Sequence, residues 1–204
     1  MRYNCEPMNT VSLLLAASLL AAAPVVPRTA VHLFAAVDTA PVPALPSASD
    51  VMAQAEAGAA ASHKNIMLVF SASWCGPCRM YEALLKDPKT GPIIDRYFVI
   101  ANLDVGEKPS DKHHANSPGA DKLESSLDGA TAGYPFIVFL DPTGKPIVNS
   151  FRPVKGKAIG DNIGYPALPE EIDWYMTMLQ RGAPAVAPKE ASTIRKWLQE
   201  RGHS

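Results

Sequence analysis

Three mostly apolar segments divide the middle of the chain and predict strands. They cover residues 66–70 (IMLVF), 97–103 (YFVIANL) and 136–140 (FIVFL). The unbroken apolar run of residues 66–70 is typical of a strand that is covered on both faces. A fourth strand is expected over residues 147–151, which follow the turn-forming residues 141–144 (DPTG), so we expect it to form a hairpin with the third strand.

Helical patterns separate and follow these strands. Ser49 or Asp50 can cap a first helix that runs through residue 61. Further helices are expected over residues 77–86, about 119–127, 169–180 and 191–198. The resulting order, α-β-α-β-α-β-β-α-α, predicts an α/β fold. Its centre would be a mixed four-stranded sheet flanked by helices, with parallel pairs first and an antiparallel hairpin last.

The first 47 residues differ in composition from the rest of the chain. Residues 11–23 (VSLLLAASLLAAA) are apolar or small and uncharged. A helix that crosses a bilayer needs about 20 residues, whereas the apolar core of a secretory signal has roughly 7–15. We therefore expect residues 1–23 to be a signal peptide or an N-terminal anchor. Residues 24–47 are rich in Pro and Ala, as in an extended linker, which leaves a folded domain over residues 48–204.

Charge and cysteine content exclude several classes of protein. Nineteen Lys and Arg oppose 20 Asp and Glu, for a formal net charge of −1, so no bulk charge draws the chain to nucleic acid. Three Cys are too few, and an odd number, for a disulfide-stapled scaffold. Cys5 lies before the apolar run without a lipoprotein-type sequence ahead of it, so we do not expect a lipid there. Cys75 and Cys78 remain as a close pair.

The pair lies in Trp74-Cys75-Gly76-Pro77-Cys78, between the first predicted strand and a predicted helix. Free N–H groups and the macrodipole favour negative charge at a helix N-terminus, so a thiol there becomes a nucleophilic thiolate more readily. We expect Cys75 to be the exposed nucleophile and Cys78 to be shielded and to resolve a mixed disulfide. Gly76 lets a partner approach, Pro77 suits the first helical turn, and Trp74 offers a flat apolar surface.

The same pair also fits two less reactive roles. It could be half of a zinc site, but zinc would need two more ligands and the chain has no second CxxC; His63, His113 and His114 are the other candidates. It could be a structural disulfide, but so short a loop gains little stability from closure. We therefore expect no metal ligands, and no cofactor beyond the redox-active disulfide Cys75–Cys78.

WCGPC after a strand resembles the active site of the thioredoxin superfamily. Gly133-Tyr134-Pro135, ahead of the third predicted strand, resembles that superfamily's Gly-X-cis-Pro loop. The resemblance covers roughly residues 50–152 and implies a thioredoxin-like fold and thiol–disulfide oxidoreductase activity. It also implies that Pro135 is cis and lies beside the sulfurs, and that Tyr134 contacts the substrate, with Trp74 as a further substrate contact.

Several positions depart from the family pattern. Val69 stands where typical members carry a buried Asp that accepts a proton, so water or another carboxylate has to serve Cys78. Ala83 replaces a helix-kinking Pro. Residues 105–118 and 153–166 are insertions, and two helices follow them in place of one. We therefore expect a thioredoxin-like fold with loop insertions and an extra C-terminal helix.

Five other residues are of interest but fit ordinary structural roles better. Arg79 beside Cys78 is expected to be a solvated helix charge. Tyr165 and Pro166 are expected to anchor a loop in preference to lining a substrate groove. Trp174 and Trp197 lie on amphipathic helices, which predicts core or boundary positions.

These features predict an enzyme that reduces protein disulfides in an extracytoplasmic compartment, in the periplasm or tethered to a membrane facing it. The Gly-Pro between the cysteines resembles the reducing members of the superfamily. Exported compartments are generally oxidising, so a reductase there needs a separate membrane or soluble thiol electron donor. Two alternatives remain: a disulfide oxidase or isomerase of secreted proteins, and a non-enzymatic metal-binding or chaperone module of the same fold.

Overall fold

The computed structural model describes residues 45–202, which lie within one compact unit of the chain, Ala40–Ser204. The signal or anchor expected over residues 1–23, and nearly all of the linker, lie outside the described residues. Within residues 45–202, no helix is long and apolar enough to cross a membrane. The hydroxyl oxygen of Ser47 accepts the backbone N–H of Asp50 and so caps the first described helix, α1 (Ala48–Ser62).

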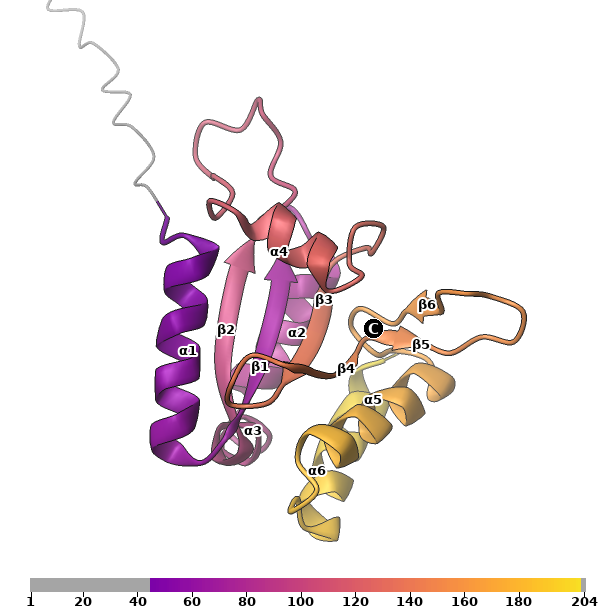
Figure 1. Cartoon of the computed structure of the whole chain (residues 1–204). Coiled ribbons are helices and arrows are strands. Elements are labelled where there is room, and N and C mark those ends of the chain that lie inside the picture. The colour runs from indigo at the N-terminus through magenta and orange to yellow at the C-terminus, as the bar shows by residue number, and fades with distance from the viewer. Residues whose placement is uncertain (1–44, 203–204) are drawn as a thin grey trace, which may run out of the picture. The chain divides into compact units, whose positions relative to one another are not determined.

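The centre of the fold is a four-stranded sheet in the order β2-β1-β3-β4 (Figure 1). Its strands are β1 (Asn65–Ser71), β2 (Phe98–Asp104), β3 (Phe136–Leu140) and β4 (Pro146–Asn149). Strands β1 and β2 are parallel, whereas β3 runs antiparallel to both β1 and β4. The predicted mixed sheet is confirmed. It contains one parallel pair where more than one was predicted, because β3 runs antiparallel to β1.

Helices cover both faces of the sheet, which explains the unbroken apolar runs in β1 and β3. Besides α1 they are α2 (Gly76–Lys86), α3 (Gly91–Tyr97), α4 (Ala120–Ser126), α5 (Pro169–Gly182) and α6 (Pro188–Arg201). Alternate residues of β1 point to opposite faces. Met67 and Val69 join a cluster with α2, α3, α5 and α6, while Ile66 and Leu68 join a cluster with α1 and α4.

Helix α3 was not expected, and the second strand begins one residue later than predicted, at Phe98. The start of α3 lies directly against the end of α2. A Cβ on Gly91 would lie 2.5 Å from the carbonyl oxygen of Leu85, so this approach requires glycine. A contact between two helices leaves no periodic signal in a segment this short.

The predicted fourth strand is divided between two elements. Strand β4 ends at Asn149, and Phe151 belongs to β5 (Phe151–Arg152), which pairs with β6 (Asp161–Asn162) in a separate two-stranded sheet. The Phe151 ring packs 5.4 Å from the Phe136 ring, between ring centroids. The insertion expected over residues 153–166 is therefore mostly part of a ribbon, seen at the right of Figure 1. We call residues 151–162 the ribbon.

Helices α5 and α6 confirm the two predicted C-terminal helices. Trp197 is 4% exposed within the α6 interface. Trp174 is half-buried and donates its indole N–H to the carbonyl of Asn149 at 3.2 Å. The core or boundary positions expected for Trp174 and Trp197 are therefore confirmed.

Candidate active site

Cys75 and Cys78 lie where β1 leads into α2, and they are joined by a disulfide. Cys75 is the residue that caps α2, and its sulfur accepts the backbone N–H of Cys78 at 3.0 Å. Pro77 lies in the first turn, where its missing N–H leaves no partner unsatisfied. A thiolate at Cys75 is therefore stabilised by a hydrogen bond and by the positive end of the helix dipole.

The two cysteines are exposed in the opposite order to the prediction. Cys75, expected to be exposed, is only 2% exposed. Cys78, expected to be shielded, is partly exposed and lines a groove. Cys78 lines the groove together with residues of β1 and of β2, which is an edge strand of the sheet, whereas Cys75 is not among the lining residues.

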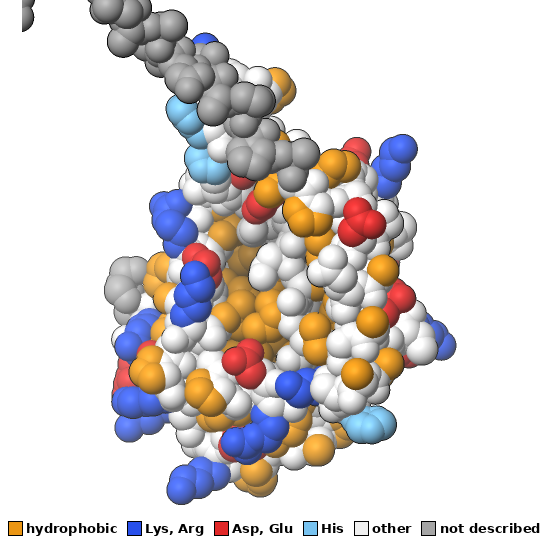
Figure 2. Space-filling view, turned by 90° about the vertical axis from the view of Figure 1, so that its left-hand side faces the viewer, with side chains coloured by type: hydrophobic (Ala, Val, Ile, Leu, Met, Phe, Trp, Pro, Cys, Tyr) orange, Lys and Arg blue, Asp and Glu red, His pale blue; other side chains and the backbone are white. Residues whose placement is uncertain are grey.

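The groove has a volume of about 510 Å³ and is lined by residues of β1, β2, α2 and the loop between β1 and α2. Figure 2 shows a hollow with an apolar floor on this face. Val69, 4% exposed, and Ile100 are apolar members of the lining, and charged side chains stand around it: Arg79, Glu82, Lys86 and Asp104. No strand of residues 45–202 pairs with the outer edge of β2, so the groove stays open.

Trp74 is the most exposed large apolar side chain described beside the disulfide, at 52%. Its indole N–H donates to the carbonyl of Gly106 at 3.0 Å, and its ring meets Tyr134 edge-on, with centroids 6.1 Å apart. Gly106 has a φ of +75°, and a Cβ there would lie 2.5 Å from the Tyr134 ring. Trp74, Tyr134 and Gly106 thus form one contact that fixes the aromatic surface next to Cys75.

The peptide bond Tyr134–Pro135 is cis, as the resemblance implied. Asn162, at the end of β6, holds this loop from outside. Its side-chain amide donates to the carbonyls of Gly133 and Pro135, the latter at 3.1 Å, and its carbonyl oxygen accepts the Ser150 hydroxyl at 2.6 Å. The ribbon therefore fixes the cis-proline loop on both sides of Tyr134.

Within this loop, the side chain of Tyr134 is half-buried. Burial raises the pKa of its phenol, and the neighbouring Glu124 carboxyl raises it further. Gly164 lies close by, since a Cβ there would be 3.7 Å from the carbonyl oxygen of Tyr134. The backbone of Tyr134, which is expected to contact the substrate, therefore lies next to Gly164, just after the ribbon.

Glu107 ties the 105–118 insertion to the active-site loop. It is 7% exposed, and its carboxylate accepts both the backbone N–H and the hydroxyl of Ser73, the latter at 2.8 Å. Its own N–H donates to the side chain of Asn116 at 2.8 Å. Because Ser73 directly precedes Trp74, this carboxylate positions the loop that carries Cys75.

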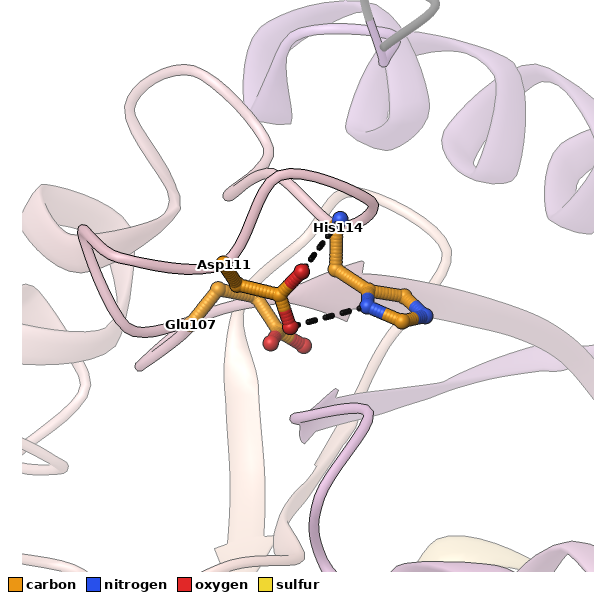
Figure 3. A group of neighbouring side chains, drawn as sticks. All are labelled: Glu107, Asp111 and His114. Carbon is orange, nitrogen blue, oxygen red and sulfur yellow. Dashed lines mark hydrogen bonds and ion pairs between the residues drawn. The ribbon is translucent and has the colours of Figure 1, made fainter. Parts of the chain in front are cut away.

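Glu107, Asp111 and His114 gather at the foot of the insertion (Figure 3). Their potential ligand atoms lie within 4.8 Å of one another. Asp111 accepts the N–H groups of His113 and His114, which lowers the pKa of its carboxyl, and it also contacts the His114 ring nitrogen Nδ1 at 3.0 Å. Glu107, Asp111 and His114 all have hydrogen-bond partners among the described residues. The expectation that the chain has no metal ligands stays a prediction.

No carboxylate replaces the family's buried Asp at its usual place, since Val69 lies in an apolar cluster. Asp104, at the end of β2, is the carboxyl group that lines the groove from the sheet side, together with Cys78. Burial raises the pKa of Asp104, and the nearby Glu107 carboxylate raises it further. Asp104 lines the same groove as Cys78, and we therefore predict that it is the carboxylate that serves Cys78 in place of the family's Asp.

The remaining sequence candidates take the structural roles expected of them. Arg79 is exposed and donates to the carbonyl of Ser73 at 3.2 Å. Tyr165 and Pro166 are buried, Tyr165 within the core cluster next to α5 and α6. Gly76 contacts little, since a Cβ there would meet only Arg79 at 3.9 Å.

The sequence did not point to Asn162, Glu107 or Asp104 as parts of the site. Each lies in or next to an insertion, and each acts on a segment distant in the chain. The only sequence signal for these three residues was that the insertions follow strands whose ends lie near the dithiol. Strands β1 and β2 are parallel, so their carboxyl ends, and the loops that follow, meet at one edge of the sheet.

Residues 48–142 match the family model described as thioredoxin-like. The protein disulfide-isomerase of Zea mays is 31% identical over 84 residues, which are 41% of this chain and 14% of the maize protein. The chain therefore spans only a small part of the length of that relative.

Solved structures show weaker similarity. The disulphide isomerase from Xylella fastidiosa Temecula1 gives a TM-score of 0.44 at 19% identity, covering 75% of this chain and 89% of the other. The oxidised C-terminal domain of DsbD from Neisseria meningitidis gives 0.40 at 21% identity, covering 66% and 97%.

Proposed function

The chain is a thioredoxin-like protein by its match over residues 48–142, and from this premise we propose that it is a thiol–disulfide oxidoreductase acting through Cys75 and Cys78. The observation that carries the proposal is the bonded cysteine pair at the start of a helix. The exposed Trp74 next to Cys75 contacts Tyr134 of the cis-proline loop, which supports a polypeptide as the substrate.

In the proposed cycle the Cys75 thiolate attacks one sulfur of a substrate disulfide. The substrate S–S bond breaks, and its second sulfur leaves as a thiolate that takes up a proton. Cys78, as a thiolate, then attacks the Cys75 sulfur, which releases the first substrate sulfur and forms the Cys75–Cys78 bond. The substrate gains two electrons and two protons, and a separate thiol donor must restore the dithiol.

Insulin reduction tests this cycle. Cys75→Ser should abolish activity, because it removes the attacking sulfur, and Cys78→Ser should accumulate mixed disulfides that mass spectrometry detects. Cys5→Ser is the matched control and should retain activity. Full activity of the Cys75→Ser protein would contradict the mechanism.

We favour a reductase over an oxidase because Gly76-Pro77 separates the cysteines, as in the reducing relatives. The second candidate is an oxidase or isomerase, and the similarity to the protein disulfide-isomerase of Zea mays supports the isomerase. Alkylation of the thiols in intact cells distinguishes these activities, because it reports whether the Cys75–Cys78 pair is reduced or oxidised. A mostly reduced pair would support the reductase or isomerase, and a mostly oxidised pair would support the oxidase.

The proposed location is an extracytoplasmic compartment, supported by the apolar run at residues 11–23. Cell fractionation of the full chain and of a chain that starts at residue 24 tests it. Export only of the full chain is the expected result, and equal export of both would contradict it.

A further inference from the structure

We propose that Glu107 is a positioning residue that makes the dithiol site select polypeptide disulfides over small ones. It acts on the exposed ring of Trp74 through Ser73. The inference rests on the proposed redox function and adds a determinant of substrate choice, which the 105–118 insertion supplies.

Glu107 holds the residue that directly precedes Trp74. One carboxylate oxygen accepts the backbone N–H of Ser73, and the other accepts the Ser73 hydroxyl at 2.8 Å. Arg79 donates to the carbonyl of the same residue at 3.2 Å. Hydrogen bonds that involve an ionised group are stronger than neutral ones. Glu107 is therefore a strong anchor for the backbone that leads into Trp74.

Glu107 is itself fixed by the base of the insertion. It is 7% exposed, and its N–H donates to the side-chain oxygen of Asn116 at 2.8 Å. At the other end of the insertion, the N–H of Ser117 donates to the carbonyl of Asp104 at 2.8 Å, and the N–H of Asp104 donates to the Ser117 hydroxyl at 3.2 Å. These bonds close the base of the insertion, so the Glu107 carboxylate is held in one place.

Trp74 offers a substrate a surface that the insertion holds at two points. Its side chain is 52% exposed, its indole N–H donates to the carbonyl of Gly106 at 3.0 Å, and its ring meets Tyr134 edge-on. Gly106 directly precedes Glu107 in the chain. The insertion therefore holds Trp74 by its ring and also by the backbone before it.

Polypeptide and small disulfides use this surface differently. In both reactions the Cys75 thiolate forms a bond to one substrate sulfur, the substrate S–S bond breaks, and the other sulfur leaves as a thiolate. The chain around a polypeptide disulfide also covers Trp74, and binding to a surface that is fixed in advance costs less ordering. A disulfide without a chain around it gains nothing from Trp74. Fixing Trp74 therefore favours polypeptide disulfides alone.

Mixed-disulfide formation at Cys75 measures this choice without turnover or an electron donor. The full chain carries Cys5→Ser and Cys78→Ser, so that Cys75 is the only thiol. It is mixed in separate series with insulin and with 2-hydroxyethyl disulfide, a small neutral disulfide. Samples are quenched with acid and weighed by mass spectrometry, which gives a rate constant for each disulfide. We call the ratio of the two rate constants, insulin over the small disulfide, the selectivity.

Glu107→Ala removes both bonds to Ser73 and should lower the selectivity about fivefold, with the rate constant for the small disulfide changed less than about twofold. Glu107→Gln keeps an acceptor for the Ser73 N–H and a polar partner for its hydroxyl, so its selectivity should stay within about twofold of the parent protein. Asp111→Ala is the matched control, because Asp111 accepts the N–H groups of His113 and His114 within the same insertion. Its selectivity should not change. Urea midpoints verify that each variant is folded.

A double-mutant cycle shows whether Glu107 acts through Trp74. Trp74→Ala alone should lower the selectivity at least as much as Glu107→Ala does, and adding Glu107→Ala to it should lower the selectivity no further. A further loss in the double variant would overturn the inference. An unchanged selectivity in Glu107→Ala would also overturn it, as would equal losses in Glu107→Ala and Glu107→Gln.

The outcomes separate this inference from the proposed function. A chain that shows the expected selectivities but does not reduce insulin catalytically would contradict the proposed cycle and leave the inference standing. Catalytic reduction of insulin, together with an unchanged selectivity in Glu107→Ala, would do the reverse. No mixed disulfide at Cys75 with either disulfide would contradict both.

Discussion

At the scale of single residues, Glu124 on α4 is a buried acid with an incomplete set of partners. It is 6% exposed, and its oxygen Oε1 has no hydrogen-bond partner within the described structure. Burial, and to a lesser degree the Asp121 carboxylate, raise the pKa of Glu124 to about 7. The folded protein therefore holds a proton here that the unfolded chain releases near pH 4.5.

Stability should consequently fall as the pH rises from about 4.5 to 7, because the folded state binds the extra proton and loses it over this range. Glu124→Gln should raise the free energy of unfolding by about 1–2 kcal/mol at pH 8, a value that allows for solvent screening. The gain should vanish at pH 4. Urea denaturation at both pH values measures it, with the exposed Glu82→Gln as control. A gain of equal size at pH 4 would rule out titration of Glu124 as the cause.

At Gly106 the addition of a single Cβ atom should lower the stability of the fold. Gly106→Ala should destabilise the fold through its positive φ, about 1 kcal/mol, and further through the clash with the Tyr134 ring. Gly156→Ala isolates the first effect, since its φ is +84° and nothing lies within 4 Å. Urea midpoints should therefore fall further for Gly106→Ala. Equal losses would show that the ring moves aside without cost.

At the scale of elements, the ribbon acts on the site through Asn162. Few residues join the ribbon to the main sheet, but the Asn162 side chain connects the cis-proline loop to Ser150 at the end of β4. Ser150 in turn accepts the N–H of Ile137 at 3.0 Å. The ribbon therefore belongs to the framework that holds Tyr134 in place.

Asn162→Ala should cost about 1–3 kcal/mol of folding free energy, because it removes the partners of the buried Pro135 carbonyl and the buried Ser150 hydroxyl. It should also raise KM for insulin more than it lowers kcat, since it loosens the substrate loop and leaves the sulfurs unchanged. Asn162→Asp keeps the acceptor for Ser150 and removes the donor to Gly133 and Pro135. Asn162→Asp should therefore share the KM effect. An unchanged KM in both variants would assign Asn162 a role in stability alone.

At the scale of the whole molecule, α5 and α6 complete the core beneath the active-site helix. Tyr175 of α5 meets Tyr81 of α2, with their hydroxyl oxygens 3.0 Å apart, and Leu198 of α6 is fully buried in the same cluster. The family match ends at residue 142, so these helices lie beyond it.

Leu198→Ala should therefore destabilise the fold by about 2–5 kcal/mol, as a cavity in a closed core does. Its exposed neighbour Gln199→Ala is the control and should change stability by less than about 0.5 kcal/mol. The urea midpoint of each variant measures the difference. Equal midpoints for the two variants would show that α6 contributes little to the stability of the core.

The sequence by itself determined the dithiol, its place between a strand and a helix, and the mixed sheet. These depend on neighbouring residues and on local periodicity, which a single chain displays directly. The cis state of Pro135 was available only through resemblance. Tertiary structure decided which cysteine is more exposed, because Cys78 lines the groove beside the edge strand β2, whereas Cys75 is 2% exposed. It also decided the roles of Asn162 and Glu107, whose partners are distant in sequence, so only folding brings them together.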